Sequence, residues 1–269
     1  MNALTFTLKK TLQHSLNCAE LTPSNLANKL VTEIGSTLLQ YGKAKLRVDE
    51  IFEITGNDTQ NIYFKNSTEK LDYLGANMTS GTMQIEGNVG AYLGFGLKQG
   101  KINCYGNTAA FAACNMAGGL LEISGNTGDF LGGASAGLRK GMHGGVVIVK
   151  GNAADRVGDQ MRRGLILIEG SVGEYCGSRM IAGTIGVLGD TGKFIGFNMQ
   201  RGTLLLTKIP KLHATIQDCG MHTLPFLSLL FKSFKQYNTK FSDIKSQRIQ
   251  RFSGDLACNG NGEILLISP

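Results

Sequence analysis

The sequence predicts an all-β fold: a right-handed parallel β-helix of about seven 19-residue turns, with small capping segments that contain short helices. Three features predict it, namely a repeat of constant length, apolar residues at alternate positions within each repeat, and 37 glycines in 269 residues. One repeat of this length cannot bury its own apolar face, whereas stacked repeats can, and parallel pairing between turns satisfies the backbone. The connections between successive parallel strands of one sheet are right-handed by default. The rival fold is a β-propeller, but its blades need about 40 residues each.

The repeat is visible when the chain is written in rows that begin at residues 62, 81, 100, 119, 145, 164, 183 and 202. Successive rows start 19 residues apart, except that the row at 119 carries seven extra residues around GGASAGLRK. Two apolar columns lie two residues apart, which is typical of a strand with one buried face. The first column holds Phe64, Met83, Ile102, Leu121, Val147, Ile166, Ile185 and Leu204, and the second holds Ile85, Cys104, Ile123, Val149, Ile168, Val187 and Leu206.

Further columns predict how each turn bends. A glycine follows each strand, where a side chain would clash, and the next position is polar, which favours a hydrogen-bonded ladder at the turns. An aromatic or aliphatic stretch comes later in each row, and a methionine stands three residues before most row starts. We interpret the methionines as core filling rather than as a ligand stripe, because unbranched Met fills irregular space. The polar column holds Asn88, Asn107, Asn126, Asn152, Ser171 and Asp190, and the methionine column holds Met78, Met116, Met142, Met161, Met180 and Met199.

The flanking segments divide the chain into three parts: an N-terminal cap with one helix (1–61), the repeats (62–208) and a basic C-terminal tail (209–269). In the cap, Thr22 is a predicted N-cap, Pro23 the first helical residue, and Gly42 the end of the helix. Residues 46–56 are predicted as a strand that leads into the first turn. In the tail, residues 224–237 predict a short apolar helix whose Phe226 and Phe231 dock either on the far turn or on a partner protein.

Composition limits the function. The net charge of +7 fits either an anionic partner or ordinary solubilising charge. The six cysteines form no C-x-x-C or Cys/His cluster, so no zinc or iron–sulfur site is expected in this chain. No signal peptide and no apolar run of membrane-spanning length are visible. We therefore expect a cytoplasmic protein with reduced thiols, bound neither to a membrane nor to nucleic acid.

The sequence offers no catalytic constellation. The four histidines are isolated, and no G-x-S-x-G, H-E-x-x-H or P-loop motif occurs. The densest charge cluster, Asp155 to Arg163, favours an ion-pair network or a partner contact over a catalytic acid. The inserted loop is the best candidate for function, since insertions in one repeat often carry it. The candidate partner contacts are Arg139, Lys140, His143, Arg162, Arg163, Phe226 and Phe231, with no catalytic or metal-binding residue predicted.

The repeat also resembles a known family. The unit G-x-x-M-x-x-G-x-[IL]-x-[IV]-x-G is similar to the repeat of the C subunit of formylmethanofuran dehydrogenase. It occurs at 158–170 and 177–189, and it occurs at 75–87 with Met83 in place of the Ile or Leu. The same turn resembles the C-terminal domain of the large chain of glutamate synthase. The stretch from GLRKGMHGG to MIAGT, with the tail elements DCG, LPFL and GDLACNGNGEILL, looks most like the C subunit of the bacterial formyltransferase/hydrolase complex.

The resemblance implies a non-catalytic scaffold subunit in one-carbon metabolism. It implies a complex that moves a formyl group from formyl-tetrahydromethanopterin to a methanofuran-type carrier and releases formate. It further implies three partners, which hold the carrier and the metal ions: an amidohydrolase-like A subunit, a molybdopterin-enzyme-like B subunit and a formyltransferase D subunit. Two alternatives stay open: the C subunit of a molybdenum or tungsten formylmethanofuran dehydrogenase, and a glutamate-synthase-like spacer domain. An independent β-helical acyl transferase is disfavoured, because such enzymes repeat every six residues.

Overall fold

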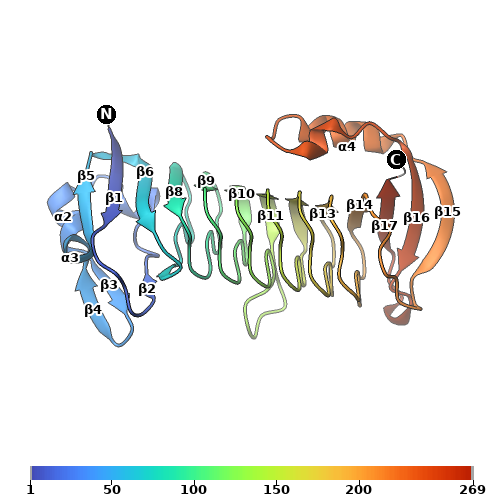
Figure 1. The fold of residues 1–269 in the computed structure, drawn as a ribbon, viewed down its shortest axis with the longest axis horizontal. Helices are drawn as coiled ribbons and strands as arrows, with labels where there is room; N and C mark the ends of the chain where they lie inside the picture. The colour runs from blue at the N-terminus through green and yellow to red at the C-terminus, as the bar shows by residue number, and fades with distance from the viewer. Residues whose placement is uncertain (1, 268–269) are drawn as a thin grey trace.

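The fold is dominated by one large β-sheet, which confirms the all-β class. A computed structural model describes residues 2–267 as an elongated stack of turns with a cap at each end (Figure 1). The strands are β1 (Ala3–Leu8), β2 (Leu16–Asn17), β3 (Leu38–Tyr41), β4 (Ala44–Arg47), β5 (Phe52–Thr55), β6 (Asp58–Ser67), β7 (Leu71–Asp72), β8 (Thr82–Gly87), β9 (Lys101–Cys104), β10 (Ala117–Ile123), β11 (His143–Val149), β12 (Arg163–Ile168), β13 (Thr184–Val187), β14 (Thr203–Leu206), β15 (Gln217–Thr223), β16 (Arg248–Gly254) and β17 (Gly262–Ile267). The helices are α1 (Pro23–Leu26), α2 (Val31–Ser36), α3 (Val48–Ile51) and α4 (Phe226–Phe234), with 3₁₀ turns η1 (Lys240–Asp243) and η2 (Leu256–Cys258).

Strands of successive rows pair in parallel at the predicted register. Ile102 lies opposite Leu121, and Ile166 opposite Ile185, so each strand meets the one 19 residues later. The inserted loop leaves this register intact, because Leu121 lies opposite Val147. The large sheet has the order β15-β16-β17-β14-β13-β12-β11-β10-β9-β8-β6-β1-β5. It therefore extends beyond residues 62–208: β1 adds a parallel strand at one end and β17 adds another beside β14.

The turns are joined by the polar ladder that the sequence predicts. Each polar side chain accepts a hydrogen bond from the backbone N–H of the corresponding residue in the next turn, for example Asn107 Oδ1 from Asn126 N at 2.8 Å. The ladder runs without a break from Asn88 to Asp190. Since these side chains cap backbone donors that the tight turns leave free, the ladder fixes the spacing between turns.

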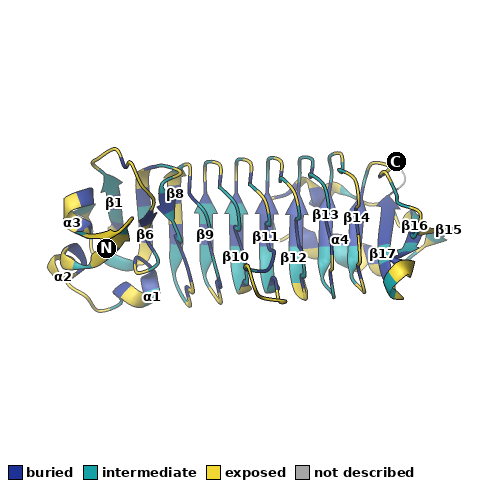
Figure 2. Cartoon of the chain, turned by 90° about the horizontal axis from the view of Figure 1, so that it is seen from below, coloured by how far each residue is buried: buried dark blue, intermediate teal, exposed yellow. Residues whose placement is uncertain are grey.

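The interior is filled by the predicted apolar columns. All six methionines of the predicted column are fully buried, so their role in the core is confirmed. Four of the six cysteines, Cys18, Cys104, Cys114 and Cys176, are also buried, and burial raises the pKa of the Cys104 thiol to about 11. Exposed residues gather at the turns and in the caps, as Figure 2 shows.

The single long helix predicted in the N-terminal cap is wrong. Thr22 does cap a helix, and its Oγ1 accepts a hydrogen bond from Asn25 N, but α1 ends at Leu26. Asn28 has a left-handed backbone, which breaks the helix before the short α2. Residues 38–41 then form β3, which pairs with β4 across a tight turn at Gly42. The predicted strand over 46–56 is likewise split, because α3 lies between β4 and β5.

Candidate functional site

The inserted loop leaves the stack between β10 and β11 and projects from one edge of it (Figure 1). Its base is held: Asn115 Nδ2 donates to Ser135 Oγ at 3.0 Å, and Gly141 N donates to Gln160 O at 3.0 Å. Its tip is free, with Leu138, Arg139 and Lys140 exposed. The loop therefore presents an apolar side chain and two cations on a fixed base.

The structure brings four of the predicted contact residues together in pairs. The Arg162 guanidinium donates to the carbonyl oxygen of Arg139 at 3.2 Å, which joins the loop to the next turn. His143 and Arg163 are the first residues of β11 and β12 and lie opposite each other in the sheet. His143 is half-buried, and its Nδ1 lies 3.3 Å from Gly141 O. Lys140 extends the same loop into solvent.

The ion-pair network predicted for residues 155–163 is formed with an arginine outside that range. Asp159 is 1% exposed, and it accepts hydrogen bonds from the Ser178 hydroxyl at 2.6 Å and from Arg179 Nε at 2.9 Å. Its ion-pair partner is thus Arg179, one turn along the stack, rather than Arg156, Arg162 or Arg163. The hydrogen bond that Arg179 donates to Asp159 raises the pKa of the guanidinium above its ordinary value.

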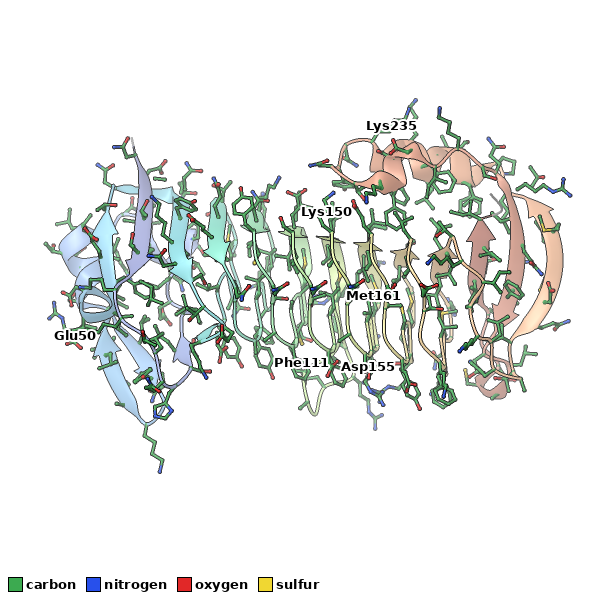
Figure 3. All side chains as sticks on the ribbon, viewed as in Figure 1. Glu50, Phe111, Lys150, Asp155, Met161 and Lys235 are labelled. Atoms are coloured by element: carbon green, nitrogen blue, oxygen red, sulfur yellow. The ribbon has the colours of Figure 1, made fainter. Side chains whose placement is uncertain are left out.

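Arg156 completes a stack of aromatic side chains. Its guanidinium lies 5.8 Å from the Phe130 ring centroid and 4.6 Å from that of Tyr175, so it fills the one position in the stack without a ring. Neighbouring rings lie 4.6–5.0 Å apart. All members have a left-handed backbone, and they are Tyr73, Tyr92, Phe111, Phe130, Arg156, Tyr175 and Phe194. This stack runs along the edge marked by Phe111 and Asp155 in Figure 3, opposite the edge that carries Lys150.

The C-terminal segment forms a second apolar core on the outer face of the sheet. The strands under it are apolar on both faces, since Leu167, Leu205 and Leu265 point away from the first core and are fully buried by this segment. The predicted helix over 224–237 is confirmed as α4. Of its two predicted contact residues, Phe231 is 4% exposed and packs within this core, so it docks α4 on its own sheet and is not offered to a partner. Phe226 is 46% exposed and stays on the surface.

Glu169 fastens this segment to the stack. Its side chain is 5% exposed, lies 2.8 Å from Lys150 Nζ, and accepts a hydrogen bond from Lys240 N at 3.0 Å. Lys150 also donates to the Asn238 carbonyl oxygen. Burial raises the pKa of Glu169, but the hydrogen bonds from Lys150, Lys240 N and Thr239 outweigh it and hold the pKa below the ordinary value of 4.5.

The docking of residues 226–247 should therefore depend on pH. The pKa of the Glu169 carboxyl is lower in the docked state than in the unfolded chain, so the ionised carboxyl stabilises the docked state above pH 4.5. This stabilisation is lost as the pH falls through the pKa of the docked state. We expect amide protection factors in residues 238–244, measured by hydrogen exchange, to fall between about pH 6 and about pH 3. In Glu169→Gln they should already be low at the upper end of this range and change little with pH. Equal pH dependence in both chains would contradict this role.

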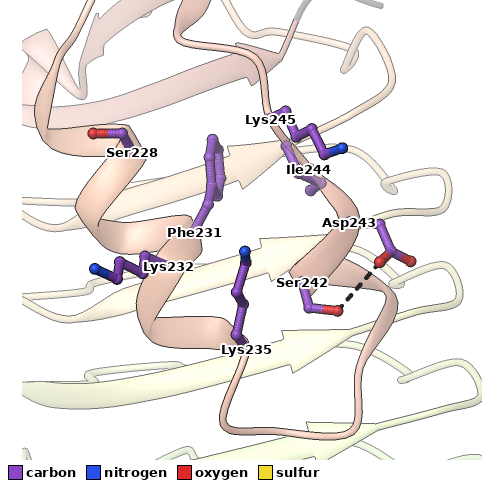
Figure 4. Close-up of a pocket in the computed structure, with 8 residues that line it drawn as sticks. All are labelled: Ser228, Phe231, Lys232, Lys235, Ser242, Asp243, Ile244 and Lys245. Carbon is purple, nitrogen blue, oxygen red and sulfur yellow. Dashed lines mark hydrogen bonds between the residues drawn. The ribbon is translucent and has the colours of Figure 1, made fainter.

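A basic groove lies between α4 and η1 (Figure 4). It has a volume of about 680 Å³ and is lined by Lys232, Lys235 and Lys245, with Asp243 as its one acid. Phe231 forms part of its apolar wall. Among its lining residues, the Ser242 hydroxyl lies 3.4 Å from the carboxylate of the next residue, Asp243, which is a long contact, and we interpret the open groove as a binding surface.

Within residues 2–267, no three His, Cys, Asp or Glu side chains lie close enough to hold a metal ion. In the same range no histidine is hydrogen-bonded to a carboxylate: His143 and His222 face carbonyl oxygens, and His213 lies 2.8 Å from the Thr215 hydroxyl. No helix in this part of the chain has the length and apolarity needed to cross a membrane.

Comparisons with known proteins give a consistent relationship. No family model matches the sequence. The C subunit of the molybdenum-containing formylmethanofuran dehydrogenase 1 of Methanosarcina barkeri (strain Fusaro / DSM 804) is 35% identical over 87 residues, 30% of this chain and 29% of that protein. A chain in the crystal structure of the formyltransferase/hydrolase complex (FhcABCD) of Methylorubrum extorquens, in complex with methylofuran, matches with a TM-score of 0.91 and 34% identity over 98% of this chain and 100% of that chain.

This chain belongs to the family of formylmethanofuran dehydrogenase C subunits. The family resemblance inferred from the repeat motif is thereby confirmed. The match covers 98% of this chain and 100% of the solved chain, so the two proteins share the fold over nearly their whole length.

Two features of this family member were missed in the sequence. Gln160, Arg179 and Asn198 are 19 residues apart, and this spacing alone would have placed Arg179 beside Asp159. The second core was signalled by the runs VVIV, LILI and LLL, in which the outward position is apolar, unlike MQIE and INCY in earlier rows. The second signal is a departure from the repeat, and it marks where the C-terminal segment covers the sheet.

The Asp159–Arg179 pair should stabilise the stack measurably. In Arg179→Met the buried carboxylate loses its charged partner but keeps the Ser178 hydroxyl, so we expect a loss of about 2–3 kcal/mol in the free energy of unfolding. The double variant Asp159→Asn/Arg179→Met should regain part of it, because an amide costs less to bury. Urea unfolding followed by circular dichroism measures both. Arg163→Met is the control, and equal stability of the single and double variants would contradict the pairing.

Proposed function

We propose that this chain is the non-catalytic scaffold subunit of a cytoplasmic formyltransferase/hydrolase complex, and that its stack is a right-handed parallel β-helix. The complex converts formyl-tetrahydromethanopterin, by way of a formylmethanofuran-type carrier, to formate. The observation that carries the proposal is the likeness of nearly the whole chain to a chain of such a complex. The parallel 19-residue register and the default hand of parallel crossovers support the β-helix.

The proposed division of labour follows the family resemblance, and the positions of the buried acids are compatible with it. This chain uses its buried acids for structure, as Asp159 with Arg179 and Glu169 with Lys150 illustrate. The formyl transfer is then assigned to a formyltransferase D subunit and the hydrolysis to an amidohydrolase-like A subunit, beside a molybdopterin-enzyme-like B subunit. The carrier and the metal ions belong to those partners in this proposal.

A second candidate is the C subunit of a molybdenum formylmethanofuran dehydrogenase, favoured by the 87-residue match to the Methanosarcina barkeri protein. The match to the solved formyltransferase/hydrolase chain extends over 98% of this chain at nearly the same identity, so we favour the hydrolase. The two candidates differ in the chemistry of the assembled complex: one releases formate without electron transfer, and the other exchanges electrons with an acceptor.

The proposal is tested by reconstitution. The purified chain should show no formyl transfer and no hydrolysis alone, and it should elute with its co-expressed partner proteins in a fixed ratio on size exclusion. The assembled complex should release formate from formyl-tetrahydromethanopterin and carrier without an electron acceptor. Turnover by the isolated chain would contradict the scaffold role, and formate chemistry that requires an acceptor would favour the dehydrogenase.

A further inference from the structure

A second groove lies beside the inserted loop, on the side of the stack opposite the docked α4 segment. It has a volume of about 440 Å³ and is lined by residues of four successive turns. Its lining is rich in hydrogen-bond donors and contains no carboxylate. The donors are the guanidinium groups of Arg139, Arg162 and Arg179 and the carboxamides of Gln160, Asn198 and Gln200.

Two of the three guanidinium groups of this groove have no carboxylate partner among the described residues, whereas Arg179 pairs with Asp159. Among residues 2–267, no carboxylate lies within 4.0 Å of Arg139 or Arg162. The two acids bonded to groove residues are buried and occupied: Asp159 by Ser178 and Arg179, and Asp255 by the backbone N–H groups of Asn198 and Ala257. Neither can turn outward without leaving those donors unpaired. The groove therefore keeps unpaired guanidinium groups open to solvent.

We propose that this groove binds an acidic segment of another protein of the complex. Arginine suits carboxylates because its planar group donates two parallel hydrogen bonds. Gln160, Arg179 and Asn198 repeat at the spacing of adjacent strands, roughly 4.8 Å, so the donors form a row that fits several carboxylates rather than one ion. Phe111 and Phe130 line an adjoining hollow that shares Arg139, Gln160 and Arg179, but these two rings stack on each other at 4.9 Å, which leaves no room for a base between them and disfavours nucleic acid. The inference rests on the proposed function, since it names the chemistry of one partner contact.

The test uses the assembled complex and the variant Arg139→Glu/Arg162→Glu. The dissociation constant of this chain from its partners should rise at least tenfold, and its salt dependence should become weaker. The control is Lys29→Glu/Lys45→Glu, which makes the same charge change on exposed residues of the N-terminal cap and should bind as the unaltered chain does. Arg139→Gln/Arg162→Gln keeps the test valid if charge reversal harms folding, and it should weaken binding in the same direction.

A photo-crosslinking amino acid at Gln160 identifies the occupant. The expected product joins this chain to a peptide of a partner protein that contains several Asp or Glu residues. A crosslink to a peptide without acids, a crosslink to nucleic acid, or full affinity of both groove variants would overturn the inference. Failure of the unaltered chain to bind any partner would instead overturn the proposed function, so the two failures are distinguishable.

Discussion

Replacing Gly106 by valine is expected to prevent continuous stacking of the turns. A Cβ atom at this position would lie 2.2 Å from Gly87 O and 2.4 Å from Gly87 C, both of them backbone atoms. The turn of Gly106 cannot shift away from Gly87 without displacing the following turn, because Gly125 N donates to Gly106 O at 3.1 Å. We expect a loss of about 3 kcal/mol or more in the free energy of unfolding, at or above the upper end for overpacking.

Circular dichroism during urea unfolding measures this effect, because the chain has no tryptophan whose fluorescence could be followed instead. Ser124→Val is the matched control, because Ser124 is exposed on the adjacent turn and should change stability by less than about 0.5 kcal/mol. Equal midpoints for the two variants would mean that the glycine column does not set the spacing of the turns. Because each turn contacts only its neighbouring turns, the parts of the stack on either side of Gly106→Val should unfold separately, and the unfolding transition should become broader.

Replacing Phe241 by alanine is expected to release the C-terminal segment from the sheet. Phe241 is fully buried, and its ring lies 6.0 Å from that of Phe234 in an edge-on arrangement. It also covers Gly186, where an added Cβ would lie 2.6 Å from Phe241 Cε1. Truncating a buried Phe costs about 3–5 kcal/mol, which is enough to undock a segment held by one small core.

Limited proteolysis of residues 226–247, read by mass spectrometry, detects the release. Gly186→Leu should have the same effect from the opposite side of the contact, because its side chain occupies the place of the ring. Phe226→Ala is the control, since Phe226 is half-exposed and should leave cleavage unchanged. If Phe241→Ala resisted protease as the unaltered chain does, the second core would not be what holds the segment.

The repeat made the sheet predictable. A period of 19 assigns Ile102, Leu121 and their equivalents to neighbouring strands, and the observed register agrees. The N-terminal cap could not be predicted in the same way, because the apolar spacing of Leu26, Leu30 and Ile34 suits a helix that Asn28 interrupts. Leu30 is 69% exposed, whereas Leu26 and Ile34 are fully buried, so the three residues do not share one face.

The candidate contact residues were only partly predictable. The insertion drew attention to Arg139 and the charge cluster to Arg162, and the structure joins the two. Arg179 was missed because a stack brings together residues of different turns, so its distance along the sequence hides its contact with Asp159. Phe231 and Phe226 look alike in the sequence, and only docking against Leu205 and Leu265 decides which of them is buried.

The most direct test of the scaffold role is affinity purification of the tagged chain from its native cell, with mass spectrometry of the proteins that co-elute. We predict co-elution of an amidohydrolase-like protein and a formyltransferase in fixed ratio, with activity only in the assembled fraction. Recovery of a lone monomer that carries transferase or hydrolase activity would contradict the role, and the inserted loop around His143 would then become the candidate active site.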